Sequence, residues 1–152
     1  MSTFTAFTDF LEKISNIIIG TLVAIITTTV FIQVVYRILG LSIPWTDEVA
    51  RFSFIWLVFI GASVQVKNNA HFSVTIIKDR IKNHKYLDIF VYIAMLVLSF
   101  VLLIYGKEYT LMGLGRVSPV MNIRMIWIYA AIPVGGLLMI IYIIEKLLHS
   151  II

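Results

Sequence analysis

Residues 14–36 read ISNIIIGTLVAIITTTVFIQVVY and contain no Asp, Glu, Lys or Arg. A helix rises about 1.5 Å per residue, so roughly 20 residues cross the hydrocarbon core of a bilayer. The 23 residues of this run are therefore enough for one membrane-spanning helix. Three further uncharged runs follow, at residues 52–66, 89–106 and 125–144. The pattern predicts an all-α integral membrane protein with four transmembrane helices.

The composition of the whole chain agrees with this fold class. Of the 152 residues, 61% are hydrophobic and 13% are charged, and the mean hydropathy is +1.01. A soluble domain usually carries about 25% charged residues. The net charge of +4 is typical of a membrane protein whose Lys and Arg contact anionic lipid, so we expect no nucleic-acid partner. The chain has no cysteine, which excludes disulfides and thiolate metal sites.

The four runs predict a single membrane domain over residues 1–152, with short amphipathic segments at the membrane surface. In the first segment Phe4, Phe7, Leu11 and Ile14 recur at helical spacing, which is typical of an interfacial helix. We expect no cleaved signal peptide, because the apolar stretch that follows is too long for one. The predicted segments are an interfacial helix at 1–13, spans at 14–36, 45–69, 88–109 and 125–146, and an amphipathic loop at 70–87.

Small residues and proline add detail to two of these spans. Gly20 and Ala24 lie four residues apart in the first span, which predicts a face for close helix packing. Pro133 lies inside the fourth span, where it frees the carbonyl of Tyr129 and predicts a kink.

The connection between the second and third spans is the most basic part of the chain. With it, the side of the membrane that carries both termini has seven Lys and Arg, against five on the other side. This excess predicts cytoplasmic termini. The residues of the connection that we expect to contact the interface or lipid are His71, Lys78, Arg80, Lys82 and Lys85.

Enzyme and transport-site patterns are mostly missing from the sequence. The three histidines lie at helix edges or in loops, whereas a haem-binding bundle places them inside its spans. No carboxylate lies in the middle of a span, where a self-sufficient proton-coupled exporter would carry one. We therefore predict no catalytic residue, no metal ligand and no cofactor in this chain.

One constellation at the start of the second span could carry a function. Asp47 and Arg51 are four residues apart, and Glu48 and Arg51 three apart, so all three can meet on one helix face. The second uncharged run has only 15 residues, which draws Arg51 toward the membrane and favours carboxylate partners for it. An anchor at headgroup level remains an equal alternative. The residues of this candidate partner interface are Trp45, Asp47, Glu48, Arg51 and Trp56.

At these residues the sequence resembles the small membrane subunit, of the DctQ type, of tripartite ATP-independent periplasmic (TRAP) transporters. The resemblance covers residues 14–146. Two positions depart from the family pattern: Asp47 stands where glutamate is common, and Arg124 where an apolar residue or proline is frequent. The residues that carry the resemblance are Tyr36 and Arg37, the run PWTDEVAR at 44–51, Trp56, Gly61, Ala62, His71, Ser118, Pro119, Tyr129, Pro133 and Gly135.

The resemblance implies a role that composition alone does not give. It implies a non-catalytic subunit of the bacterial inner membrane that scaffolds a large membrane subunit, at which sodium and substrate bind. It also implies a periplasmic substrate-binding protein as partner of the assembled complex, and organic acids such as sialic acid or C4-dicarboxylates as substrates. Two alternatives stay open: a small four-helix membrane enzyme of the glutathione or eicosanoid type, and a self-sufficient small exporter.

Overall fold

The computed structural model describes residues 2–69 and 84–151, and this part of the chain is almost wholly helical. Four of its segments are long and apolar enough to cross a membrane: Thr5–Ile38, Pro44–Asn68, Phe90–Gly115 and Ile126–Leu148. The predicted all-α fold with four spans is thereby confirmed. The elements are α1 (Ser2–Ile38), α2 (Pro44–Asn69), α4 (His84–Met112), the 3₁₀ helix η1 (Gly113–Gly115), α5 (Ile126–Tyr129) and α6 (Ala131–Ile151).

The helices extend further than the uncharged runs. Helix α1 is continuous from Ser2, whereas the sequence predicted an interfacial helix at 1–13 and a separate span. Helix α4 begins at His84, so Lys85 lies in its first turn and not in the connecting loop. Charged residues mark the edge of the membrane, but the backbone hydrogen bonds of a helix continue past them. The 37 residues of α1 reach about 55 Å, well beyond a core of about 30 Å.

The first turns of α1 present a different face from the predicted one. Phe7 and Phe10 are exposed, whereas Leu11 packs against the hydrophobic core. The predicted stripe placed Leu11 and Phe7 together on one apolar face of an interfacial helix. The helix is turned so because Asp9 and Glu12 both contact Lys67 of α2, which brings Leu11 inward with them.

A glycine ends α1 and sets the turn into α2. Gly40 has a φ of 73°, a left-handed conformation that residues with a Cβ rarely adopt. The N–H of Gly40 bonds to the carbonyl of Arg37, and the N–H of Leu41 to that of Tyr36, at 3.1 and 3.0 Å. These two bonds make a Schellman motif, which satisfies carbonyls that the helix end leaves free. Helix α2 then begins at Pro44, a favoured residue at a helix start.

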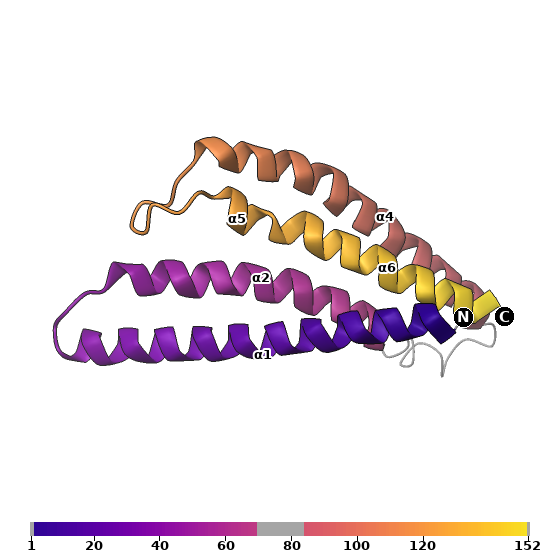
Figure 1. The fold of residues 1–152 in the computed structure, drawn as a ribbon, viewed down its shortest axis with the longest axis horizontal. Helices are drawn as coiled ribbons and strands as arrows, with labels where there is room; N and C mark the ends of the chain where they lie inside the picture. The colour runs from indigo at the N-terminus through magenta and orange to yellow at the C-terminus, as the bar shows by residue number, and fades with distance from the viewer. Residues whose placement is uncertain (1, 70–83, 152) are drawn as a thin grey trace.

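The four long helices lie side by side in the order α1, α2, α6, α4 (Figure 1). Helix α2 packs on α1 and α6, and α6 packs on α4, so α1 and α4 form the outer edges. The described helices are thus arranged as a row, an order that the sequence did not predict. Both termini lie at one end of the row, called here the terminal end (Figure 1). Residues 39–43 and 113–125 form the opposite end, the turn end.

Adjacent glycines let α6 lie close to both of its neighbours. A Cβ at Gly135 would come within 2.8 Å of the Phe59 Cβ on α2, and one at Gly136 within 3.1 Å of the Ser99 carbonyl oxygen on α4. Small residues allow such close approach between membrane helices. The predicted small-residue face of α1 does not pack against the described part of the chain, where Gly20 has no neighbouring atom within 4 Å of its Cβ position.

The fourth span is interrupted where proline predicted a kink. Helix α5 ends at Tyr129 and α6 begins at Ala131, so the break at Ala130 lies three residues before Pro133. Proline has no N–H to donate, and the carbonyl of Tyr129 is its lost partner. Between this break and the terminal end, Tyr142 and Ile143 of α6 and Val66 of α2 lie in the buried core.

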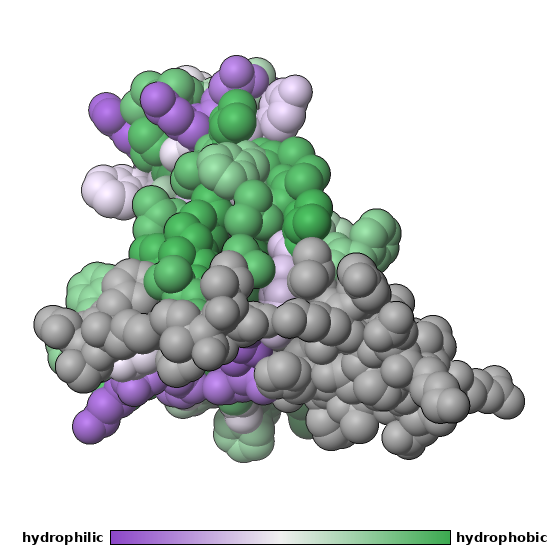
Figure 2. Space-filling model, turned by 90° about the vertical axis from the view of Figure 1, so that its right-hand side faces the viewer, coloured by the Kyte–Doolittle hydropathy of each residue, from purple (hydrophilic) through white to green (hydrophobic). Residues whose placement is uncertain are grey.

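Much of the remaining surface is hydrophobic, as expected for spans that face lipid or another membrane protein. Figure 2 looks onto the terminal end and shows hydrophobic surface over the middle of the described part of the molecule. Hydrophilic residues gather at the upper and lower edges of that view. Outer helices α1 and α4 carry many exposed apolar side chains, including Phe31 at 68% and Phe90 at 70%.

Candidate functional site

Glu48 lies in the first turns of α2 and is only 3% exposed. Its carboxylate accepts hydrogen bonds from the Val120 N–H at 3.1 Å and the Met121 N–H at 3.0 Å. It also accepts one from the hydroxyl of Ser118, which is fully buried. All three donors belong to the loop between η1 and α5. Glu48 therefore ties this loop to α2, because a buried carboxylate is stabilised only where donors satisfy its oxygens.

The loop that Glu48 holds has a hairpin-like form. Val117 and Arg124 form an isolated antiparallel bridge, and Asn122 between them has a φ of 54°. Asparagine is among the few residues that tolerate this left-handed conformation. Val117, Val120 and Met121 are exposed, so the loop presents apolar side chains at the turn end while its backbone is held from behind.

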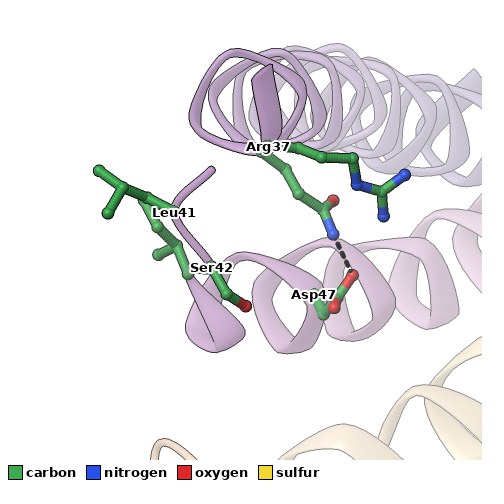
Figure 3. Close-up of a pocket in the computed structure, with 6 residues that line it drawn as sticks. Arg37, Leu41, Ser42 and Asp47 are labelled. Atoms are coloured by element: carbon green, nitrogen blue, oxygen red, sulfur yellow. Dashed lines mark hydrogen bonds between the residues drawn. The ribbon is translucent and has the colours of Figure 1, made fainter. Parts of the chain in front are cut away.

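Asp47 and Arg51 have different surroundings from Glu48. Asp47 accepts a hydrogen bond from the Gln33 side-chain amide of α1 at 2.7 Å (Figure 3). Within residues 2–69 and 84–151, Arg51 is exposed and has no ion pair to Asp47 or Glu48 within 4 Å. The predicted three-residue ion cluster is thus divided, because each carboxylate faces a donor from another element. Their predicted contact with a partner subunit stays a prediction.

Asp47 lines a small polar pocket at the turn between α1 and α2. The pocket has a volume of about 160 Å³ and lies beside the end of α1, where the Arg37 guanidinium is found (Figure 3). The two predicted interface tryptophans both lie on α2: Trp45 is 43% exposed, and Trp56 is half-buried. The pocket is lined by Gln33, Arg37, Leu41, Ser42, Ile43 and Asp47.

Sequence reasoning missed a second charged cluster, at the terminal end. Lys67 Nζ lies 2.6 Å from Asp9 Oδ1, 3.0 Å from Glu12 Oε2 and 4.0 Å from Glu145 Oε2. The Lys67 side chain is only 10% exposed, and its Nζ also lies 5.7 Å from the centre of the Tyr142 ring. The cluster joins α1, α2 and α6, and we call these four charged residues the Lys67 cluster.

A topological signal for the Lys67 cluster was present in the sequence. With four spans, the start of the first helix, the end of the second and the end of the fourth lie on one side of the membrane. Asp9 and Glu12 are three residues apart on one of these segments, and Lys67 and Glu145 lie on the other two. Opposite charges near one membrane surface could therefore have been paired, although their contacts depend on which helices are neighbours.

The remaining predicted contacts are only partly covered by the structure. His71, Lys78, Arg80 and Lys82 lie outside the described residues, as does most of the predicted loop at 70–87. Lys85 lies in the first turn of α4. Within the described part of the chain, no group of three or more His, Cys, Asp or Glu side chains is placed to hold a metal ion.

The sequence matches a known family of membrane proteins. The family model of the DctQ component of tripartite ATP-independent periplasmic transporters matches residues 26–152, most of the chain. The chain belongs to this family. The match contains the Glu48 site, every residue that lines the polar pocket, and all of α2, α4 and α6.

Individual DctQ-type relatives agree with the family match. A Haemophilus influenzae protein named as a TRAP transporter small permease is 28% identical over 93% of this chain and 90% of its own length. The sialic acid TRAP transporter small permease SiaQ of Vibrio cholerae is 24% identical over 69% of this chain and 62% of its own. The isethionate TRAP transporter permease DctMQ of Oleidesulfovibrio alaskensis is 35% identical over 42% of this chain, which spans only 11% of that protein.

Proposed function

We propose that this DctQ-type chain is the non-catalytic small membrane subunit of a sodium-coupled TRAP transporter for organic acids, and that it scaffolds the large membrane subunit. The observation that carries the proposal is the family match over residues 26–152, together with four spans and a flat row of helices. Among residues 2–69 and 84–151, this row leaves both of its broad faces without further helices. Such a fold suits a subunit that packs against a larger membrane protein.

The likeness to DctMQ supports a large membrane partner. In that permease the segment similar to this chain occupies only 11% of a much longer protein. One continuous chain there carries both the similar segment and a far larger remainder. We propose that the corresponding large subunit meets this chain as a separate protein, and that the sodium and substrate sites lie in that subunit.

The substrate class is proposed from the names of two relatives. SiaQ belongs to a sialic acid transporter and DctMQ to an isethionate transporter, and both substrates are organic anions. We propose an organic acid, with sialic acid as the first candidate and C4-dicarboxylates as the next. A periplasmic binding protein delivers it to the assembled complex in the bacterial inner membrane, with both termini of this chain in the cytoplasm.

The enzyme and exporter alternatives have less support. An enzyme acting on glutathione conjugates needs several charged side chains along facing helices. Here the uncharged runs at 14–36, 52–66, 89–106 and 125–144 leave charges only near the ends of the spans. A self-sufficient exporter needs an ionisable group in the bilayer interior, and the same runs contain no Asp, Glu, Lys or Arg.

Co-purification tests the assembly directly. An affinity tag on this chain should retain the co-expressed large TRAP subunit, in about equal amounts, through detergent extraction and gel filtration. An unrelated four-span membrane protein with the same tag serves as the control. If the large subunit elutes alone while this chain remains monodisperse, the scaffold role is wrong.

A further inference from the structure

Helix α1 lines two depressions, of which one is shared with the start of α2. One is the polar pocket at the turn end described above, of about 160 Å³. The other is an apolar groove of about 470 Å³ farther along the same helix, lined by Ile26, Thr27, Val30, Phe31 and Val34. The pocket is far larger than the roughly 10–15 Å³ that a cavity needs to hold a single water. Both can hold parts of a larger molecule.

The groove and the pocket adjoin each other on α1. Val34 follows Val30 by four residues and Arg37 follows Val34 by three, which places Val30, Val34 and Arg37 on successive turns of the same side. Val30 and Val34 line the groove, whereas Gln33 and Arg37 line the pocket. One extended molecule can therefore occupy both, with an apolar portion along α1 and a polar portion at its end.

The depth of the pocket corresponds to the headgroup region of a bilayer. Arg37 is the first charged residue after the 23 uncharged residues of the first span. Tyr36 precedes Arg37 in the sequence and Trp45 lies in the first turn of α2; they are 39% and 43% exposed. Exposed Tyr and Trp are enriched at the level of lipid headgroups. The groove, one to three turns farther along α1, then lies at the depth of the acyl chains.

The charges around the pocket are of both signs. Within the described residues, the Arg37 guanidinium has no carboxylate within 4 Å and can donate to an anion. Asp47 accepts from Gln33 through Oδ1 and contributes a carboxylate to the pocket lining. Figure 3 shows Arg37 on α1 and Asp47 on α2 on two sides of this region. A ligand with a phosphate and a nearby cation complements this arrangement.

We propose that this face of α1 binds a phospholipid whose headgroup carries a primary ammonium, with the chemistry of phosphatidylethanolamine. The phosphate bonds to Arg37, the ammonium donates to Asp47, and one acyl chain lies along Val30 and Val34. A glycerol headgroup has no cation and would place its phosphate near an unpaired Asp47 carboxylate. A choline headgroup has a cation but no N–H to donate, so it fits less well.

Native mass spectrometry of the full chain in detergent tests the site, with palmitoyl-oleoyl phosphatidylethanolamine, phosphatidylglycerol and phosphatidylcholine added separately. The parent should retain one phosphatidylethanolamine more tightly than either of the other lipids. Arg37→Ala should weaken that binding about fivefold, as expected for a partly exposed charge pair. The matched control Arg116→Ala removes an exposed arginine of the same end outside the pocket and should leave binding unchanged.

Two further variants separate headgroup and chain contacts. Asp47→Asn should abolish the preference for phosphatidylethanolamine over phosphatidylglycerol, whereas Glu108→Gln, at an exposed position of α4, should keep it. Val30→Trp fills the groove and should weaken all three lipids while the headgroup preference remains. If the parent binds the three lipids equally, or if Arg37→Ala binds like the parent, the proposal is wrong. Either result is expected if the groove receives a helix of the large subunit rather than a lipid.

Discussion

At the residue scale, Glu48 and the Lys67 cluster link elements that are distant in sequence. Glu48 joins α2 to a loop more than sixty residues later, and Lys67 joins α2 to both ends of the chain. In each case a charged residue near a helix end has its partners on another element of the fold. A buried charge without a partner destabilises the folded state. The pairing of Glu48 and Lys67 therefore favours the fold in which their partner segments lie beside α2.

Replacing Glu48 tests the attachment of the loop. In Glu48→Gln one carboxylate oxygen becomes an amide that donates rather than accepts, so it opposes the donors of Ser118 and Met121. Amide hydrogen exchange at Met121 should accelerate about tenfold, because its N–H loses a buried acceptor, and exchange at Val120 should accelerate as the loop loosens. Glu108→Gln is the matched control and should leave both rates unchanged. Equal rates in parent and Glu48→Gln would show that the loop is held by other contacts.

Replacing Lys67 tests the Lys67 cluster. Lys67→Met keeps much of the side-chain volume but leaves Asp9, Glu12 and Glu145 without their common cation. Because Lys67 is mostly buried while Asp9 is exposed, we expect a loss of about 1–3 kcal/mol in unfolding free energy, between the values for exposed and buried pairs. Thermal melting in detergent measures this loss.

Two comparisons make the Lys67 test specific. Lys13→Met removes an exposed lysine of α1 and should change the melting temperature little. Adding Glu145→Gln to Lys67→Met should recover part of the lost stability, because one unpaired carboxylate is removed. No recovery, together with an equal effect of Lys13→Met, would contradict a specific cluster.

How far the sites could be predicted depends on how local their contacts are. The sequence placed Asp47, Glu48 and Arg51 on one helix face, because i,i+3 and i,i+4 spacing is a local property. It did not indicate that Glu48 would bind a loop near Ser118, or that Gln33 would bond to Asp47. Those partners come from which helices are neighbours, and the periodicity of a single segment contains no such information.

At the element scale, helix packing depends on a few small residues of α6. Gly135→Ala would place a Cβ about 2.8 Å from the Phe59 Cβ and 3.0 Å from its carbonyl oxygen. Since backbone must then shift, we expect a destabilisation of about 1–3 kcal/mol by thermal melting. Gly20→Ala has open space and should be neutral or slightly stabilising, because alanine favours helix by about 0.5–1 kcal/mol over glycine. Equal melting temperatures for the two variants would exclude close packing at Gly135.

Orientation in the membrane is also a property of whole elements. The chain has no cysteine, so single substitutions give a clean labelling test. Ala6→Cys lies near the start of α1 and Val117→Cys in the loop of the turn end; both parent residues are exposed and uncharged. With cytoplasmic termini, a membrane-impermeant thiol reagent should label position 117 but not position 6 in intact cells, and both after permeabilisation. Labelling of position 6 in intact cells would reverse the predicted topology.

The extents of the elements show where charge patterns succeed and where they fall short. The uncharged runs predicted four spans because hydrocarbon excludes charges whatever the tertiary fold. They did not predict that α1 would continue from Ser2 or α4 from His84, because a helix does not end where the membrane does. Proline and glycine were more direct signals: Pro133 predicted the interruption near Ala130, and Gly40 ends α1.

At the scale of the whole molecule, the flat row α1, α2, α6, α4 distinguishes this fold from a self-contained bundle (Figure 1). The sequence predicted the number of spans but not their order side by side, which depends on contacts such as Gly135 with Phe59. Transport through this chain alone would need a path that the uncharged spans do not offer.

Uptake into proteoliposomes tests the proposed role most directly. Vesicles should contain this chain alone, the large TRAP subunit alone, or both, with an inward sodium gradient, radiolabelled sialic acid and the periplasmic binding protein outside. We predict sodium-dependent uptake only when both membrane subunits are present. Vesicles with this chain alone should take up no more sialic acid than empty vesicles. Saturable uptake by this chain alone, or full uptake by the large subunit without it, would contradict the proposed scaffold role.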